Sequence, residues 1–380
     1  MSKYDFDLLL RAGRLVCPAT RIDGPGVVAV RNGRIVAAGP EVQGTAERSF
    51  DFRESTLLPG LIDLHAHPAR EGSKFGVDPD AEFLSHGVTT VLSQGDAGAL
   101  NWRRYRVTTI DRSRTRVRLA INLAAPGESM PGGCFENLDD VDVEACVAAV
   151  EDGGDLIWGV AANISELVSG ATDPRELMRR ALEAAERTRR PLLFGLRQPA
   201  DWPLEEQLAL LRPGDVVTYC FRSEPCGIVQ NGRIHPAVHE ARRRGVLFDV
   251  GHGMRSFDFA VAEAALAEGF APDTISTDRH IRHAGANPPH TLPRTMSKLL
   301  AAGMAEGAVL EAVTSRPARV LGLEAEIGTL ATSACADLVV LHFSNEAAPL
   351  VDALGMQRPG GCWESQLTVR AGQVVPAVSE

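Results

Sequence analysis

The chain has 380 residues, of which 44% are hydrophobic and 23% are charged, with a formal net charge of −10. This length exceeds one compact core and suits a large domain with a smaller one beside it. No apolar run approaches the ~20 residues of a membrane span, and basic residues do not cluster, so we expect neither a membrane nor a nucleic acid as partner. The seven cysteines form no Cys-x-x-Cys pair and the N-terminus lacks a signal-peptide pattern, which predicts a cytoplasmic protein.

Both ends of the chain are rich in short β patterns. The candidate strands cover residues 7–16, 26–30, 34–38, 337–341 and 367–370. Asn32-Gly33 between two of them is a strong hairpin-turn signal. We therefore predict a small β-sandwich domain built from residues 1–57 and 328–380.

The long middle of the chain alternates apolar runs with amphipathic stretches. The eight candidate strands cover residues 57–64, 89–92, 117–123, 156–160, 191–194, 215–220, 245–250 and 274–278. Helical patterns cover residues 173–189 and 257–268, and Asp173 before Pro174 is typical of a helix start. Alternating strands and helices predict an α/β fold, a TIM-type (β/α)8 barrel over residues 58–327. The first strand is not followed by Gly-x-Gly-x-x-Gly, which argues against an open doubly wound sheet.

His65 and His67 end the first barrel strand, and they are the first candidates for a metal site. Residues two apart on a strand point to the same face, so both imidazoles can converge on one ion. Active sites of such barrels lie at the C-terminal ends of the strands, and neutral imidazole is a good ligand for Zn²⁺. The alternative is a pair of solvent-facing or core histidines.

Asp278 ends the eighth strand, which neighbours the first strand in a closed barrel. Its carboxylate can therefore reach the same ion, and it can also act as a catalytic group that takes a proton from water. The alternative for Asp278 is a helix cap or an ordinary salt bridge.

Several segments together resemble the amidohydrolase superfamily, in particular its dihydroorotase and N-acyl-amino-acid deacetylase-like subgroup. They are Leu58-Pro59-Gly60-Leu61-Ile62-Asp63-Leu64-His65-Ala66-His67 and residues 87–91, 245–253, 274–278, 314–318, 328–330 and 336–340. The resemblance covers nearly the whole chain. It implies hydrolysis of an amide or ester bond with one or two metal ions, and a homo-oligomer.

The departures from the family pattern concern the second metal site. Two-metal members carry a bridging lysine after the fourth strand, where this chain has Ala161. The histidines that normally end the fifth and sixth strands are replaced by Gly195 and Tyr219. What remains is His65, His67 and Asp278, and three ligands with water make a tetrahedral mononuclear site. We expect one divalent ion, with Zn²⁺ as the first candidate.

Other polar residues near the strand ends are candidates for contact with substrate. Tyr219 and Arg197 could stabilise an oxyanion, and Arg197 could instead clamp a substrate carboxylate. His252, between two glycines, and His280 are further candidates for substrate binding. Each has a structural alternative: a surface arginine, a packed tyrosine and two structural histidines. Cys220, after the sixth strand, is best interpreted as a buried, unreactive cysteine.

The sequence therefore predicts a mononuclear metal-dependent hydrolase of an amide, ester or cyclic amide bond in a small, anionic molecule. Two alternatives stay open. The barrel could catalyse a lyase, isomerase or cyclisation step without a metal, with Arg197, Tyr219, Cys220 and His252 as acid/base groups. It could also be a catalytically inactive scaffold. The substrate itself cannot be identified from the barrel, because function depends on the site rather than on the fold.

Overall fold

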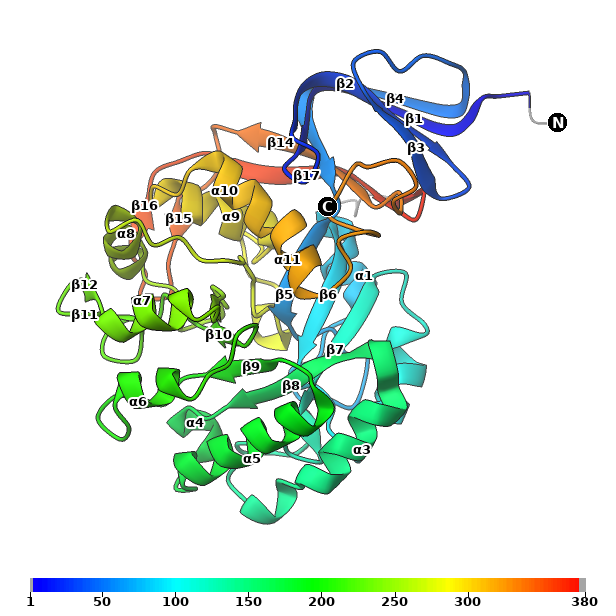
Figure 1. Ribbon diagram of the computed structural model, residues 1–380. Helices are drawn as coiled ribbons and strands as arrows, with labels where there is room; N and C mark the ends of the chain where they lie inside the picture. Colours follow the sequence, from blue (N-terminus) through cyan, green and yellow to red (C-terminus); the bar gives the residue numbers. More distant parts are fainter. Residues whose placement is uncertain (1–2, 376–380) are drawn as a thin grey trace.

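The computed structural model describes residues 3–375 and contains a parallel barrel with a second sheet at one end (Figure 1). Within these residues, seven parallel strands pair in the order β13-β10-β9-β8-β7-β6-β5. Their bounds are β5 (Leu61–Ala66), β6 (Val88–Gln94), β7 (Arg116–Asn122), β8 (Ile157–Asn163), β9 (Leu192–Gly195), β10 (Val216–Thr218) and β13 (Leu247–Phe248). Each overlaps one of the predicted strands, because a continuous apolar run suits a strand that is buried on both faces.

Residues 274–278 close the barrel between β13 and β5, although they form an isolated bridge rather than a regular strand. On one side, the backbone of Thr274 bridges Asp249 and its carbonyl accepts a hydrogen bond from Val250 N at 3.1 Å. On the other side, Asp278 N donates to His65 O at 2.7 Å. The predicted (β/α)8 barrel is therefore confirmed, with an irregular eighth strand.

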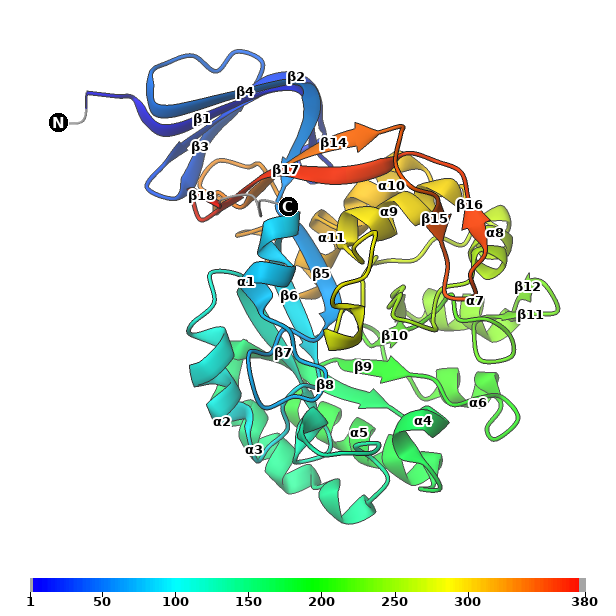
Figure 2. The same ribbon diagram turned by 180° about the vertical axis from the view of Figure 1, so that it is seen from behind.

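Helices surround the barrel on its outside (Figures 1 and 2). Their bounds are α1 (Pro79–Glu82), α2 (Trp102–Tyr105), α3 (Val143–Gly153), α4 (Glu166–Ser169), α5 (Pro174–Thr188), α6 (Leu204–Ala209), α7 (Pro236–Arg243), α8 (Phe259–Ala267), α9 (Leu292–Ala301), α10 (Glu306–Ala312) and α11 (Ser315–Val320). The predicted start of α5 is confirmed, since Asp173 accepts a hydrogen bond from Arg175 N at 2.9 Å. None of the helices within residues 3–375 has the length and apolar character needed to cross a membrane.

The second sheet is built from both ends of the chain, as expected. Among the described residues it has seven strands in the order β18-β17-β14-β4-β1-β2-β3. Their bounds are β1 (Phe6–Cys17), β2 (Ile22–Arg31), β3 (Arg34–Gly39), β4 (Ala46–Pro59), β14 (Leu338–Ser344), β17 (Cys362–Arg370) and β18 (Gln373–Val375). The strands form one continuous ladder, because the 14-residue β4 pairs with β1 along most of its length and with β14 at its end. The domain boundaries at residues 57 and 328 stay a prediction.

A hairpin leaves this sheet and returns to the barrel. It consists of β15 (Leu350–Val351) and β16 (Gln357–Arg358), and Figure 2 shows it beside α8 and α9. The Asp352 carboxylate accepts a hydrogen bond from Phe259 N at 3.0 Å, at the start of α8. A second small hairpin, β11 (Val229–Gln230) and β12 (Arg233–Ile234), follows β10. The β11–β12 hairpin contacts α8, and the turn of the β15–β16 hairpin lies beside the segments that follow β8, β9, β10 and β13.

Candidate active site

His65, His67 and Asp278 meet at the C-terminal end of the barrel, as the sequence predicted. Asp278 Oδ1 lies 3.5 Å from His65 Nε2 and 3.3 Å from His67 Nε2. The three donor atoms lie within 4.8 Å of one another, and all three residues are buried. Ligands of tetrahedral Zn²⁺ at bond lengths of about 2.0–2.1 Å lie roughly 3.3 Å apart. The spacing of the carboxylate from both imidazoles therefore fits one ion.

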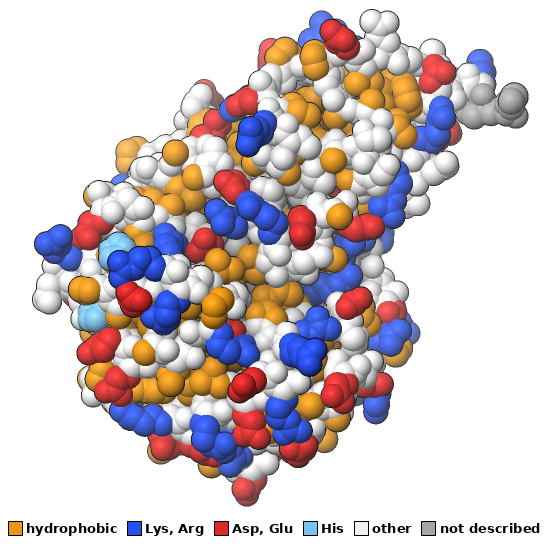
Figure 3. Space-filling view, viewed as in Figure 1, with side chains coloured by type: hydrophobic (Ala, Val, Ile, Leu, Met, Phe, Trp, Pro, Cys, Tyr) orange, Lys and Arg blue, Asp and Glu red, His pale blue; other side chains and the backbone are white. Residues whose placement is uncertain are grey.

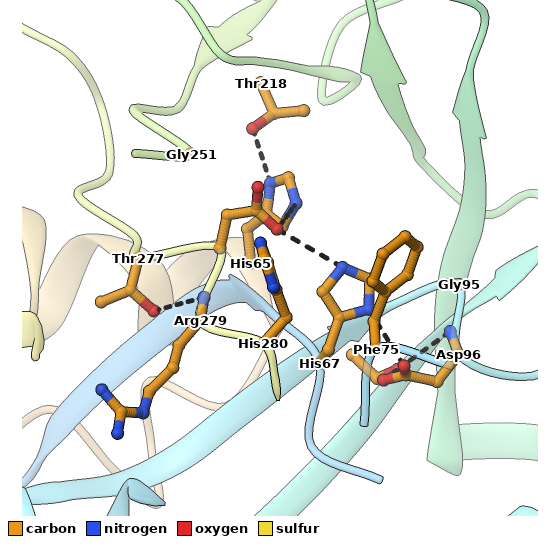
Figure 4. A network of polar contacts seen from close by, with 12 residues as sticks. His65, His67, Phe75, Gly95, Asp96, Thr218, Gly251, Thr277, Arg279 and His280 are labelled. Atoms are coloured by element: carbon orange, nitrogen blue, oxygen red, sulfur yellow. Dashed lines mark hydrogen bonds and ion pairs between the residues drawn. The ribbon is translucent and has the colours of Figure 1, made fainter. Parts of the chain in front are cut away.

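The ring of His67 is held by Asp96, which follows β6. His67 Nδ1 lies 2.9 Å from Asp96 Oδ1, and the hydroxyls of Ser73 and Ser93 donate to the same carboxylate at 2.6 Å each. Because the carboxylate can only accept, His67 Nδ1 carries a proton, and Nε2 points toward Asp278. A carboxylate behind a histidine is the usual way to orient a metal ligand. Figure 4 shows Asp96 on the side of the His67 ring that faces away from His65.

The ring of His65 is oriented by a hydroxyl in place of a carboxylate. His65 Nδ1 lies 2.7 Å from Thr218 Oγ1, and the Thr218 hydroxyl donates to Asp249 Oδ2 at 2.9 Å. Since the hydroxyl proton goes to Asp249, the oxygen accepts from His65 Nδ1–H. Asp249 is also held by Ser276 and Thr274, both at 2.6 Å. Both imidazoles thus direct Nε2 toward Asp278 Oδ1.

Asp278 occupies an unusual backbone conformation next to a glycine. Its φ angle is +50°, in the left-handed region that side chains other than glycine rarely adopt. A Cβ atom at Gly253 would lie 2.4 Å from Asp278 Oδ2, so only glycine leaves room for the carboxylate. The Asp63 carboxylate fixes the segment from behind, where it accepts from Thr277 N at 3.1 Å and from the Thr277 hydroxyl at 2.5 Å. Residues far apart in the chain therefore determine where Asp278 points.

The pKa values of His65, His67 and Asp278 depend on one another, because their charged groups lie close together. Burial alone would lower the pKa of His67, but Asp96 and Asp278 outweigh it and raise the pKa to about 10. In the same way Asp249 and Asp278 overcome burial and raise the pKa of His65 to about 9. Burial would raise the pKa of Asp278, yet the two imidazoles hold it well below its ordinary value. Two nitrogens and one carboxylate oxygen form a donor set suited to a divalent ion such as Zn²⁺, whose binding would displace the imidazole protons.

Tyr219 directly follows β10, at the strand end where the family resemblance leads one to expect a histidine ligand. Its hydroxyl is 3.2 Å from His65 Nε2, and its buried ring contacts His65 edge-on, with the ring centroids 4.9 Å apart. Burial raises the pKa of the Tyr219 phenol well above its ordinary value, so the hydroxyl remains a proton donor. Ala161 is buried in β8 and offers no ligand. Within residues 3–375, His65, His67 and Asp278 are the only such group of three donors found.

Three further candidates from the sequence have partners within the protein. The Arg197 guanidinium donates to Asp201 Oδ2 at 2.7 Å and to Ser169 Oγ at 3.0 Å. His252 Nδ1 donates to Gly253 O at 2.7 Å, and its Nε2 accepts from Lys298 Nζ at 2.8 Å. Both groups are buried and engaged within the protein. This agrees with a structural role for His252, whereas the alternative of a surface arginine is wrong for Arg197, which is buried and paired with Asp201. Substrate binding by either one stays a prediction without direct support.

His280 lies closer to the metal ligands than His252 does. Its ring contacts His67 edge-on, with a centroid distance of 6.0 Å, and it also contacts Phe75 (Figure 4). Burial lowers the pKa of His280 to about 4, so the imidazole is neutral near pH 7. Its Nδ1 accepts from Arg282 N at 3.2 Å, which holds the ring at the rim of the site. Substrate binding by His280 remains a prediction that this location permits. Cys220 is completely buried, and burial raises its pKa well above the ordinary value, in agreement with an unreactive thiol.

Sequence reasoning missed the residues that orient the two histidines: Asp96, Thr218 and Asp249. Each follows or ends a barrel strand, so the same strand-end rule that selected Asp278 could have selected them. Lys298, the buried partner of His252, lies on α9 and carries no such positional signal.

The chain is similar to known proteins over nearly its whole length. The profile of the amidohydrolase family matches residues 252–358. A deacetylase from Enterococcus faecalis is 30% identical over 359 residues, which cover 93% of this chain and 94% of that relative. This chain belongs to the amidohydrolase family.

Two solved structures also resemble this amidohydrolase closely. An adenine deaminase has a TM-score of 0.88 and 29% identity, with 98% of this chain and 100% of that chain covered. A dihydroorotase has a TM-score of 0.87 and 27% identity, with coverages of 97% and 99%. These relatives confirm the predicted superfamily and subgroup. They show an amidohydrolase-type enzyme that hydrolyses C–N bonds, which favours hydrolysis over the lyase and scaffold alternatives.

Proposed function

We propose that this amidohydrolase uses one divalent metal ion, Zn²⁺ as the first candidate, to hydrolyse an amide, ester or cyclic amide bond in a small molecule. The observation that carries the proposal is the orientation of His65 and His67. Both rings are held at Nδ1 by buried partners and present Nε2 toward Asp278 Oδ1. Purely structural histidines would have no need for this convergence on a third donor.

When bound, a divalent ion at this position lowers the pKa of water and polarises a carbonyl group. Asp278 supplies the carboxylate that takes up a proton during the reaction, since its Oδ1 lies 3.5 and 3.3 Å from the two imidazoles that would hold the ion with it. Tyr219 supplies a neutral hydroxyl beside His65 that can donate to a developing oxyanion. In a buried site this donation is stronger than in water.

A single ion is proposed because the second site offers no replacement ligands. Ala161 and Gly195 have no donor side chain, and the Tyr219 phenol holds its proton. In this proposal, Tyr219 fills part of the space of a second cation, and its hydroxyl stabilises the negative charge that a second cation would otherwise stabilise. This division of roles agrees with the short distance between its hydroxyl and His65.

The proposal is tested by counting metal ions in the purified full-length protein and measuring turnover on a panel of N-acylated amino acids and cyclic amides. We expect at most one tightly bound ion per chain. His65→Ala should abolish both the metal and turnover, whereas His342→Ala, in the half-buried part of β14, should preserve them. Two ions per chain would overturn the mononuclear mechanism. Full turnover by His65→Ala would remove the metal from it.

A further inference from the structure

Two arginines point into the barrel at its N-terminal end, opposite the metal-ligand cluster. In β7, Arg116 and Arg118 share a face of the strand with Ala120, because residues two apart point the same way. Ala120 packs with Leu92 in the apolar cluster that fills the barrel. In register, Arg118 lies beside Leu92 and Arg116 lies beside Thr90. The barrel therefore has apolar residues in its middle and two guanidinium groups at its N-terminal end.

The second sheet brings a third arginine and one carboxylate to the same place. Asp337 directly precedes β14, and Arg370 is the last residue of β17. Arg370 Nη1 donates to Asp337 Oδ1 at 2.9 Å, and Arg116 Nη2 lies 3.5 Å from Asp337 Oδ2. The Asp337 side chain is 2% exposed, whereas those of Arg116 and Arg370 are 15% and 16% exposed and can be reached from solvent. On the face that Figure 3 shows, several Lys and Arg side chains lie where the second sheet meets the barrel.

The cluster of Arg116, Arg118, Arg370 and Asp337 has more positive than negative charge. Burial lowers the pKa of Arg118, and the charges of Arg116 and Arg370 lower it further, because the three guanidinium groups repel one another. The Arg118 side chain donates to Val117 O at 3.2 Å and forms no ion pair with any residue from 3 to 375. Three cations thus face one buried carboxylate, which leaves two positive charges without a partner. Holding such charges out of water without a counter-charge costs free energy.

A second carboxylate near Arg118 does not neutralise the cluster. Asp155 acts on Arg118 from a distance, but its side chain is fully exposed to water. Asp155 Oδ1 also lies 3.9 Å from Nη2 of a different arginine, Arg190. Water and salt screen a charge in such a position. Among residues 3–375, Asp337 is the only carboxylate that forms an ion pair with the arginines of the cluster.

Unpartnered polar atoms are concentrated in the same place. Within residues 3–375, seven buried side-chain nitrogen or oxygen atoms have no hydrogen-bond partner, and four of the seven belong here. They are Thr90 Oγ1, Arg116 Nε, Asp337 Oδ2 and Arg370 Nε. Buried polar groups nearly always have a partner, so this concentration indicates a polar occupant. The two Nε–H groups and the hydroxyl can donate, which suits a ligand with several acceptor oxygens.

We propose that Arg116, Arg118 and Arg370 bind a tetrahedral oxyanion with two negative charges, such as inorganic phosphate, at the base of the barrel. Its charge balances the two unpaired positive charges, and its oxygens accept hydrogen bonds from the guanidinium groups, including the two unpartnered Nε–H groups. Arg116 and Arg118 belong to the barrel and Arg370 belongs to the second sheet, so the bound anion connects the two and stabilises the folded chain. The site is separate from the metal-ligand cluster and takes no part in the proposed hydrolysis.

The test is a calorimetric titration of the full-length protein with sodium phosphate at pH 8, where phosphate is chiefly the dianion, at an ionic strength held constant with sodium chloride. Arg118→Gln should weaken phosphate binding roughly tenfold, the size of one charge-assisted hydrogen bond, and Arg118→Lys, which keeps the charge, should weaken it less. Arg112→Gln, at an exposed arginine on the connection that precedes β7, is the matched control and should change nothing. His65→Ala should also bind phosphate normally, because the proposed site does not include the metal-ligand cluster.

Two further measurements use the wild-type protein and do not depend on the folding of a variant. Phosphate should raise the unfolding temperature above that in sodium chloride of the same ionic strength. Wild-type crystals soaked in selenate, a heavier tetrahedral dianion, should show an anomalous peak between Arg116, Arg118 and Arg370.

The proposal is overturned if Arg118→Gln binds phosphate as tightly as the wild type, or if His65→Ala abolishes the binding. It is also overturned if millimolar phosphate neither binds nor raises the unfolding temperature, since the cluster then holds water alone. A selenate peak elsewhere, with none at the cluster, would show an adventitious ion only and would likewise contradict the site.

Discussion

Replacement of Asp96 by asparagine isolates the charge that stands behind His67. Asp96 Oδ1 accepts from His67 Nδ1 and Ser73 Oγ, and Oδ2 accepts from Ser93 Oγ. An asparagine of the same shape can keep its oxygen toward His67 and Ser73 and turn its amide nitrogen toward the Ser93 hydroxyl, which can accept. The hydrogen bonds are then preserved while the negative charge is lost. His67 becomes a weaker base and a weaker metal ligand.

The expected loss in metal affinity is about 10- to 100-fold, or about 1.4–2.7 kcal/mol. Competition with a chromophoric zinc chelator at pH 7.5 measures it. Ser93→Ala, which keeps the charge and removes one donor, should lose much less. Asp201→Asn, next to Arg197, should lose nothing. A zinc Kd for Asp96→Asn within twofold of the wild type, in a variant that unfolds at the normal temperature, would refute the view that Asp96 tunes His67.

Two further predictions concern Gly253 and Lys298. In Gly253→Ala, the new Cβ would lie 2.4 Å from Asp278 Oδ2, and this clash should lower metal affinity at least tenfold. The control is Gly269→Ala, which also has a positive φ but has open space around it. This control shows the effect of backbone strain alone and should bind metal normally. Burial lowers the pKa of Lys298 from 10.5 to about 7, so between these values the unfolded chain binds a proton that the folded chain lacks. The contribution of Lys298 to the free energy of unfolding should therefore be lowest below about pH 7 and should rise by about 1.4 kcal/mol per pH unit between pH 7 and pH 10.5. The free energy of unfolding, measured with urea from pH 7.5 to 9.5, should rise less steeply with pH in Lys298→Met than in the wild type, by this amount per pH unit. Equal dependence on pH in the two proteins would contradict the lowered pKa of Lys298.

Most of the barrel could be predicted from the sequence because its strands are continuous apolar runs. The eighth strand, residues 274–278, was predicted as well, but it contains Thr274, Ser276 and Thr277 and forms only an isolated bridge. Their hydroxyls bind Asp249 and Asp63 inside the barrel. In the sequence, a run of such polar side chains predicts a strand only weakly. Their hydrogen bonds with the distant carboxylates of Asp249 and Asp63 become apparent only in the tertiary structure. The same holds for the β15–β16 hairpin, whose attachment to α8 depends on Asp352.

The candidate site divides in the same way. His65 and His67 were predictable because alternation along a strand is a local property, and Asp278 because the first and last strands of a closed barrel are neighbours. Arg197 and His252 satisfied the same positional rule, yet Asp201, Ser169 and Lys298 occupy their polar groups. A position at the end of a strand predicts that a residue lies at the C-terminal end of the barrel. It does not predict which group the side chain binds there.

The sequence by itself determined the barrel and the pair of histidines with Asp278, because each depends on residue type and local spacing. Its resemblance to the amidohydrolase family further implied that Ala161 and Gly195 replace ligands of a second metal site. The tertiary structure alone decided that Asp96 and Thr218 orient the histidines and that Tyr219 points at His65. These features depend on contacts between segments far apart in the chain, and hydrogen bonds and ion pairs of that kind leave no periodic pattern in a sequence.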